Sequence, residues 1–170
     1  IIIGTLIRNI EKKTVTDLLT NLLNLRGFFE VMDRKFKEKK PFSLAIIQIN
    51  NFRNINDEYG HSVGDAAIKI SGERIKEVVG EKGEVSRITG AEFAIIVNGE
   101  YDAESVVRDC VKKIGERMEI SAENHSVNCY LEAIAGIAEY PKDAKDKDEL
   151  VKWADIAQMH AAESDGYVAK

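Results

Sequence analysis

The feature that most constrains this chain is the stretch of residues 84–97, EVSRITGAEFAIIV, which has the pattern of a β-hairpin. A short strand leads into a tight turn at Thr89 and Gly90, and an apolar strand follows over residues 93–97. Glycine at the tip is expected to supply the backbone freedom that the turn needs. Glu92 lies just past this turn, where a sheet presents side chains to solvent or to a ligand. A hairpin pairs its strands antiparallel, so we do not expect a parallel sheet of alternating βα units.

Apolar periodicity predicts the elements on both sides of this hairpin. Residues 24–39, 62–79, 102–118 and 146 onward have helical spacing, whereas 43–50 reads as a central buried strand and 126–140 as a strand. Residues 51–60 read as a loop or an irregular helix. Gly136 inside the last strand predicts a bulge or a close backbone approach. The order of elements predicts an α+β fold in which helices cover a mainly antiparallel central sheet.

Several side chains are expected to face the core or to cap a helix. Asp102 is predicted to cap the third helix, and Asp146 with Glu149 has the spacing of a capping box. The first and last helices are expected to turn these apolar residues inward: Leu25, Phe28, Phe29, Met32, Phe36, Leu150, Trp153, Ala154, Ala157 and Ala161.

Length and charge limit the class of protein. A chain of 170 residues is most simply one domain. Its formal net charge of −5 argues against a protein that coats nucleic acid, which would usually be strongly basic. The cysteines, Cys110 and Cys129, have no metal-ligand spacing, so we expect reduced, buried thiols and a cytoplasmic location.

The N-terminal residues are expected to connect the domain to something else. The apolar run IIIGTLI at residues 1–7 is too short to span a bilayer, which needs about 20 residues. We predict a connecting helix over residues 1–13 and a single domain over 14–170, with membrane attachment only through a larger parent protein. The alternative is that residues 1–7 pack on the core.

Five stretches together resemble one known family. Residues 17–26 read DLLTNLLNLR, 48–65 read QINNFRNINDEYGHSVGD, and 89–93 read TGAEF. Residues 135–141 read AGIAEYP, and 154–162 read ADIAQMHAA. In order and separation they resemble the DxLTGLxNRR, DxDxFKxINDxxGHxxGD, GGDEF, SxGxAxxP and ADxALYxAK signatures of the GGDEF family of bacterial diguanylate cyclases. The resemblance implies a nucleotide-cyclase-like fold with a ferredoxin-like βαββαβ core.

The resemblance places the motif that names the family at the tip of the hairpin. Its five positions are Thr89, Gly90, Ala91, Glu92 and Phe93 in this sequence. We include all five among the candidate site residues.

The resemblance also implies a reaction and a metal. Active members condense two GTP molecules into cyclic di-GMP, with one GTP in each half-site of a homodimer. Mg²⁺ prefers oxygen ligands and is usually anchored by one or two carboxylates. The family positions for those carboxylates are Gln48 and Ala91 here, which leaves Glu92 as the residual catalytic carboxylate. Magnesium binding and cyclase activity are therefore not expected.

The same comparison places the candidate nucleotide-binding residues. Asn56 and Asp65 correspond to the pair that reads guanine, and Arg53 replaces a lysine. Asn51 and Phe52, in the same motif, complete the candidate set. The alternative is structural: Asn56 holds its loop and Asp65 caps the following helix.

The remaining family positions have lost their charges. The phosphate-binding lysine corresponds to Ala162, and the arginine to Gly166 or Tyr167. The family's inhibitory RxxD site corresponds to Gly80 and Gly83, so feedback binding of cyclic di-GMP is not expected there.

These observations predict a degenerate GGDEF domain of a cyclic di-GMP signalling protein, catalytically inactive and regulatory. In this hypothesis GTP binds near Asn56 and Asp65 and controls an attached or partner phosphodiesterase domain of the EAL type. One alternative is a structural module that self-associates through residues 1–10. Another is a residual cyclase that uses Glu92 and an atypical metal arrangement.

Overall fold

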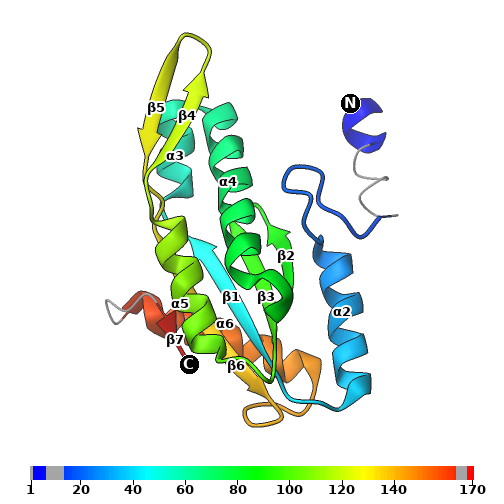
Figure 1. The fold of residues 1–170 in the computed structure, drawn as a ribbon. Coiled ribbons are helices and arrows are strands. Elements are labelled where there is room, and N and C mark those ends of the chain that lie inside the picture. Colours follow the sequence, from blue (N-terminus) through cyan, green and yellow to red (C-terminus); the bar gives the residue numbers. More distant parts are fainter. Residues whose placement is uncertain (1, 7–13, 164–167) are drawn as a thin grey trace.

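The computed structural model describes residues 2–6, 14–163 and 168–170. Its centre is a five-stranded sheet in the order β2-β3-β1-β6-β7 (Figure 1). Every neighbouring pair is antiparallel except β6 and β7. The predicted α+β fold with a mainly antiparallel sheet is confirmed. The strands of this sheet are β1 (Phe42–Ile49), β2 (Gly83–Thr89), β3 (Glu92–Asn98), β6 (Ala133–Tyr140) and β7 (Val168–Ala169).

Helices cover both faces of the sheet. One face carries α2 and α6, and the other carries α4 and α5 (Figure 1). Residues 2–6 form a separate helical turn at the N-terminal end. The helices are α2 (Leu25–Glu38), α3 (Phe52–Tyr59), α4 (His61–Val79), α5 (Ala103–Ile114) and α6 (Lys147–Glu163), with a short 3₁₀ turn, η1 (Gly80–Lys82).

The central strand β1 explains how one sheet supports two hydrophobic cores. Ala45, Ile47 and Ile49 pack with α4 and α5, whereas Phe42, Leu44 and Ile46 pack with α2 and α6. Successive side chains of a strand point to opposite faces, so a strand buried on both sides reads as a continuous apolar run. This is the pattern that the sequence shows at residues 43–50, and it confirms the predicted central strand.

Helix α6 lies in direct backbone contact with β6 at Gly136. A Cβ atom on Gly136 would be 2.1 Å from the backbone nitrogen of Gln158 and 2.2 Å from the carbonyl oxygen of Ala154. No side chain fits in that space, so the close approach predicted from the sequence is confirmed.

The region after α5 differs from the prediction. The helix ends at Ile114, and residues 118–129 form a second hairpin of β4 (Met118–Ala122) and β5 (His125–Cys129), which projects from the body in Figure 1. The predicted helix end at Met118 and the single strand over 126–140 were therefore wrong. The physical reason lies partly in Arg74 of α4, which donates hydrogen bonds to the carbonyls of Lys113, Ile114, Glu116 and Arg117 and so caps the end of α5.

Other predictions about helix ends are confirmed. Asp102 accepts hydrogen bonds from the backbone of Glu104 and Ser105, as an N-cap does. Asp146 accepts one from the backbone nitrogen of Glu149 at 2.8 Å. The stretch 51–60 is a regular helix, α3, rather than a loop.

Some side chains face away from the core, contrary to prediction. Trp153, Leu25 and Phe29 are 42%, 48% and 37% exposed, because each lies at the margin of its apolar helix face. In their place, Val31 of α2 and Gln158 of α6 are buried.

The turn of the first hairpin also differs from the prediction. It lies at Gly90 and Ala91, one residue later than expected. Gly90 is not in a left-handed conformation and has open space around it, so the expected need for glycine there was wrong.

Beyond its short pairing with β7, the edge of β6 that does not face β1 is closed near its C-terminal end by the following turn. The side chain of Asp143 accepts a hydrogen bond from the backbone nitrogen of Glu139 at 2.8 Å, and the nitrogen of Asp143 donates to the carbonyl of Glu139 at 2.8 Å. Both backbone groups of Glu139 are thereby satisfied within the chain.

Cys110 and Cys129 are free and buried, as predicted. Burial raises the pKa of the Cys110 thiol to about 12, which keeps it protonated and unreactive. Among the residues that the structure describes, no helix has the length and apolar character needed to cross a bilayer.

Candidate functional site

The candidate site lies at the end of the sheet where β1 finishes and β3 begins. Gln48 pairs with Glu92 across these strands, and the backbone nitrogen of Ile49 donates to the carbonyl of Ala91 at 2.9 Å. Gln48 shares the strand face of Leu44 and Ile46, and Glu92 that of Ala94, so both lie on the sheet face covered by α2 and α6. The structure therefore brings together Gln48, Ala91 and Glu92, the positions that the sequence singled out for metal chemistry.

Phe93, the last residue of the TGAEF motif, does not belong to this site. Its side chain is 0% exposed and lies in the core under α4 and α5, where β3 pairs Phe93 with Ile47. Because successive residues of a strand face opposite sides of the sheet, Phe93 points away from the face that carries Glu92. The prediction of Phe93 as a site residue was therefore wrong, and its role is to anchor the start of β3. Thr89, by contrast, is exposed at the end of β2, opposite Glu92.

Glu92 has a second carboxylate nearby that sequence reasoning missed. Burial and then the charge of Asp155 raise the pKa of Glu92, and burial raises the pKa of Asp155. Asp155 lies on α6, which packs on the same face of the sheet. The signal was present in the sequence, because Asp155 is the acidic residue of the ADIAQMHAA stretch that contributes to the family resemblance.

The chemistry of this donor set does not fit a two-ion magnesium site. Glu92 and Asp155 together offer carboxylate oxygens, Gln48 offers an amide oxygen, and Ala91 offers no side-chain ligand. Within the described part of the chain, no group of three or more His, Cys, Asp or Glu residues could hold a metal ion. Two neighbouring carboxylates with raised pKa values can share a proton or attract a single cation, but they do not supply the ligands that two hard, octahedral ions need.

Asn56 and Asp65, the predicted guanine-reading pair, lie on the helices that follow β1. Asn56 is on α3, and its amide rests directly on α4, since a Cβ on Gly64 would be 1.8 Å from Asn56 Oδ1. That oxygen is buried and has no hydrogen-bond partner among the described residues. Asp65, the residue after Gly64, is exposed. Asp65 thus directly follows the position of α4 on which the Asn56 amide rests.

The helix-capping alternative for Asp65 was wrong. Helix α4 begins at His61 with Gly60 as its N-cap, so Asp65 lies beyond the first turn, where a carboxylate does not cap the helix. The carboxylate of Asp65 is therefore left for solvent or for a ligand.

The other candidate nucleotide-binding residues have different surroundings. Asn51 bonds through both ends of its amide, donating to the carbonyl of Tyr130 and accepting from the nitrogen of Glu132, each at 2.9 Å. Phe52 packs against the main core, close to Gly64. The side chain of Arg53 is 91% exposed, with Asp57 3.8 Å away. In this structure Asn51 fixes the segment of residues 130–132, Phe52 packs against the core, and Arg53 is a surface cation.

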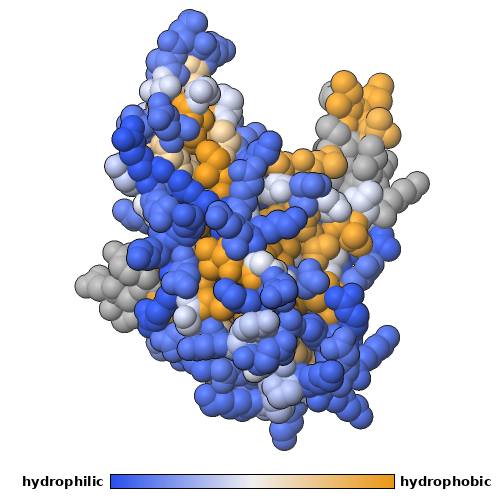
Figure 2. All heavy atoms as spheres, viewed as in Figure 1, coloured by the Kyte–Doolittle hydropathy of each residue, from blue (hydrophilic) through white to orange (hydrophobic). Residues whose placement is uncertain are grey.

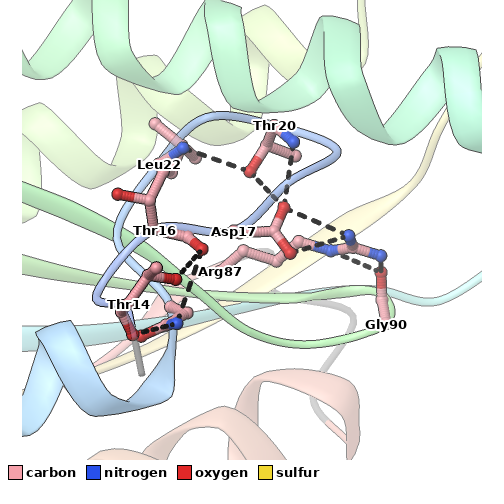
Figure 3. Close-up of polar contacts among 8 residues, drawn as sticks. Thr14, Thr16, Asp17, Thr20, Leu22, Arg87 and Gly90 are labelled. Carbon is pink, nitrogen blue, oxygen red and sulfur yellow. Dashed lines mark hydrogen bonds and ion pairs between the residues drawn. The ribbon is translucent and has the colours of Figure 1, made fainter. Parts of the chain in front are cut away.

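A polar network ties the chain before α2 to the tip of the first hairpin (Figure 3). Arg87 of β2 contacts the carboxylate of Asp17 at 3.2 Å and donates to the carbonyl of Gly90 at 2.9 Å. Thr20 donates to the same carboxylate through its hydroxyl and its backbone nitrogen. Burial raises the pKa of Asp17, but the hydrogen bonds from Thr20 and the charge of Arg87 outweigh it and hold the pKa below its usual value. Arg87 is thus part of the site's scaffold, a role that sequence reasoning had missed.

Ala162, at the position predicted to contact phosphate, is exposed on the last turn of α6 and offers no charge. Gly166 and Tyr167, the other positions predicted there, lie outside the described residues. Gly80 begins η1 and Gly83 directly follows it; these residues, at the family's product-binding positions, carry no side chain that could bind an anion.

Comparison of the sequence with protein-family models identifies its family. The profile of "Diguanylate cyclase, GGDEF domain" matches residues 14–166. The chain belongs to the GGDEF family. The GGDEF domain of FimX from Pseudomonas aeruginosa has the same fold, with a TM-score of 0.80 at 20% identity, over 91% of this chain and 98% of that one. The GGDEF domain of DgcB from Caulobacter crescentus, in complex with c-di-GMP, has a TM-score of 0.77 at 26% identity, over 92% of this chain and 95% of that one.

Among curated proteins, this GGDEF chain is 30% identical over 134 residues to the bifunctional diguanylate cyclase/cyclic di-GMP phosphodiesterase MucR of Pseudomonas aeruginosa, covering 78% of this chain and 19% of that protein. It is 30% identical over 164 residues to the signaling protein YkoW of Bacillus subtilis, covering 92% of this chain and 20% of that protein. The chain thus spans about a fifth of the length of these relatives.

Proposed function

We propose that this GGDEF domain regulates cyclic di-GMP signalling without making cyclic di-GMP itself. The observation that carries the proposal is the replacement of metal-binding carboxylates by Gln48 and Ala91 at the sheet end where Glu92 remains. Phosphoryl transfer depends on positioning and on metal ions that neutralise developing charge. A site with this donor set lacks that neutralisation.

The phosphate contacts point in the same direction. Ala162 supplies no cation, and Arg53 is a solvated surface residue. Each lost charge-assisted hydrogen bond costs about 1.5–3 kcal/mol of binding free energy. Tight binding of the triphosphate by the family's usual contacts is therefore not expected.

The base-recognition end supports a sensing role. Asp65 is exposed and is not used as a cap, and it directly follows Gly64, the α4 residue that contacts the Asn56 amide. A carboxylate accepts hydrogen bonds from N1–H and N2–H of guanine, whereas adenine offers no such pair of donors. We infer weak binding of GTP with preference over ATP.

The test combines a product assay with calorimetry on the purified chain. With GTP and Mg²⁺ or Mn²⁺, we expect no cyclic di-GMP by mass spectrometry. We expect GTP to release heat of binding with little dependence on Mg²⁺, and Asp65→Asn to remove the preference for GTP over ATP. Formation of the cyclic product by the parent chain but not by Glu92→Ala would refute the proposed inactivity. Absence of heat at millimolar GTP would refute GTP sensing.

A gain-of-function variant sharpens this test. In Gln48→Asp/Ala91→Asp the carboxylates return to an exposed strand position and a partly exposed turn, so the fold should tolerate them. We expect this variant, unlike the parent, to bind GTP more tightly when Mg²⁺ is added. An identical response to Mg²⁺ in both proteins would show that the missing carboxylates do not limit metal binding.

We further propose that the regulated enzyme is an EAL-type phosphodiesterase, attached to this domain or associated with it. The similarity to MucR and to the cyclic di-GMP phosphodiesterase NbdA of Pseudomonas aeruginosa supports this setting. In a preparation that contains both domains, GTP should change the rate of cyclic di-GMP hydrolysis, and Asp65→Asn should remove the response. A rate that does not depend on GTP would contradict the regulation while leaving the cyclase assay unaffected.

A second function, self-association, is favoured by one observation. In the helical turn of residues 2–6, Ile2, Ile3 and Leu6 are 84%, 73% and 58% exposed, and this turn forms the apolar projection at the upper right of Figure 2. We expect sedimentation velocity to show fewer copies per particle when residues 1–13 are removed. If both proteins contain the same number of copies per particle, this function is excluded.

A further inference from the structure

A cavity on the side of the sheet covered by α5 is not accounted for by the family site. It has a volume of about 530 Å³ and lies between α5, the segment of residues 130–133 and β7. Its lining includes apolar side chains, among them Val111 and Leu131. Ligand cavities usually enclose about 300–1,000 Å³ and combine apolar walls with a few polar groups. The size is therefore that of a site for one small molecule.

The polar groups of this cavity are of three kinds. Tyr130 offers an aromatic ring and is 59% exposed, although it lies among buried neighbours. Lys112 and Arg108, one turn apart on α5, offer cations, and Arg108 is already bonded to Glu104 at 2.8 Å, so Lys112 is the freer charge. Glu132 offers a carboxylate on the opposite wall.

The cavity thus combines an aromatic ring, a cation and a carboxylate around an apolar floor. These groups are complementary to the base and the phosphate of a nucleotide. A base stacks on tyrosine, and such stacking is sequence-tolerant because every base has a π-face. A lysine ammonium binds phosphate, and a carboxylate accepts hydrogen bonds from the N–H groups of a purine. We propose that the cavity lined by Tyr130, Lys112 and Glu132 is a binding site for a purine nucleoside monophosphate.

The cavity is mechanically linked to the candidate guanine site but shares none of its residues. The Asn51 amide holds the backbone of Tyr130 and Glu132, both cavity residues, through hydrogen bonds of 2.9 Å. Asn51 directly precedes α3, which carries Asn56. A ligand that moves the wall of the cavity would therefore move the start of α3. The proposal does not require the proposed function, because the ligand's contacts lie outside Asn56 and Asp65.

Calorimetry on the full chain tests the proposal with three probes. GMP carries both ring and charge, guanosine carries the ring alone, and inorganic phosphate carries the charge alone. We expect GMP to bind and each partial probe to bind at least about tenfold more weakly, since base stacking and the phosphate contact each contribute. Equal binding of GMP and inorganic phosphate would reduce the site to an adventitious anion contact and overturn the proposal.

Matched variants show which side chains bind GMP. Tyr130→Ala and Lys112→Ala should each weaken GMP binding about tenfold, whereas Tyr130→Phe keeps the ring and should stay within about twofold. Lys76→Ala, an exposed lysine of α4 outside the cavity lining, is the control for a general loss of positive charge. Because the Tyr130 and Lys112 side chains are exposed, these variants should remain folded, which circular dichroism checks.

The final comparison separates the two sites. Asp65→Asn should leave GMP binding to the cavity intact, and amide chemical-shift changes on adding GMP should map to α5 and to residues 130–133. If Asp65→Asn abolishes the binding while Lys112→Ala does not, or if millimolar GMP gives no heat, the cavity is not a nucleotide site. Loss of the proposed GTP sensing would leave the result of this comparison unchanged.

Discussion

Individual residues decide the electrostatics of the candidate site. Glu92 and Asp155 both have raised pKa values, and the charge of Asp155 contributes to the raised pKa of Glu92. Such a pair destabilises the folded state when both groups are ionised and binds protons or cations to relieve the repulsion. Burial and, for Glu92, the charge of Asp155 therefore oppose ionisation at this site, and the effect on stability can be measured.

Glu92→Gln should stabilise the protein at neutral pH. Since the folded-state pKa of Glu92 lies above its unfolded value, ionisation opposes folding above the folded pKa, and the opposition disappears below the usual value of 4.5. We expect a higher melting temperature for Glu92→Gln at pH 7.5 and no difference near pH 4. Glu119→Gln, at an exposed position of β4, is the control. A lower melting temperature at pH 7.5 would contradict the assignment.

Gln158 is a second residue whose polar side chain is energetically unfavourable in its buried position. It is 7% exposed on α6, and its Nε2 has no hydrogen-bond partner within the described part of the chain. A buried polar group without a partner costs about 1–3 kcal/mol. Gln158→Leu should therefore raise the free energy of unfolding by about 1–2 kcal/mol in urea denaturation. Gln158→Ala, which also removes the amide but leaves a void, is expected to be less stable than the leucine variant.

Secondary-structure elements differed in how far the sequence predicted them. The apolar run of β1 and the hairpin of β2 and β3 were recognised because their patterns are local. The hairpin of β4 and β5 was missed although its strands alternate apolar and polar residues, which is a strand pattern. Met118 also fits the apolar face of the preceding helix, and the end of that helix is set by Arg74 from a helix distant in sequence. Tertiary hydrogen bonds of this kind leave no signal in the sequence next to the helix end.

The same limit applies to the candidate site. The positions of Gln48, Ala91 and Glu92 followed from the family resemblance, and the pairing of β1 with β3 brings them together. Asp155 did not, because its approach to Glu92 depends on how α6 packs across the sheet. The double use of the Asn51 amide was also unpredictable, since its partners lie 79 and 81 residues away.

Phe93 shows the opposite case, in which a signal in the sequence was available and was not used. Its place in the family motif suggested a site residue, but the alternation of side chains along a strand puts Phe93 and Glu92 on opposite faces. The burial of Phe93 in the core confirms the alternation and corrects the motif-based prediction.

The contact of α6 with β6 gives a prediction about two glycines. In Gly136→Ala the new methyl group would meet backbone atoms of α6 at about the 2.1 Å separation described above, so the helix must move away from the sheet. We expect a loss of about 3 kcal/mol or more of unfolding free energy. Gly90→Ala has open space and an ordinary backbone conformation, so it should change stability by less than about 0.5 kcal/mol. Similar losses for both variants in chemical denaturation would contradict this account.

Across the whole molecule, the Asp17–Arg87 pair joins the N-terminal segment to the hairpin. Both side chains are largely buried, with 14% and 16% exposure. The lowered pKa of Asp17 means that its ionised form stabilises the fold above its usual value of 3.8, and that this contribution is lost as the pH falls through the lower folded value.

Asp17→Asn should lower the free energy of unfolding at pH 7 by about 2 kcal/mol, because a charge-assisted contact is lost. The difference from the parent should shrink at the lowest pH at which both proteins still fold. Hydrogen exchange should accelerate in residues 14–24 and at the hairpin tip, whereas the amides of β1 stay protected. Asp57→Asn, which loses only the exposed contact with Arg53, is the control. Uniform acceleration over the whole chain would show that the pair holds the entire fold.

The turn after β6 has a consequence for how copies of this protein meet. Asp143 occupies both backbone groups of Glu139, so a strand from a neighbouring molecule finds no hydrogen-bond partners at that position. Sheets that leave such groups vacant tend to grow into fibrils through edge-to-edge stacking. Here the hydrogen bonds of Asp143 close β6 at Glu139, so the sheet cannot be extended by a strand of a second copy at this point.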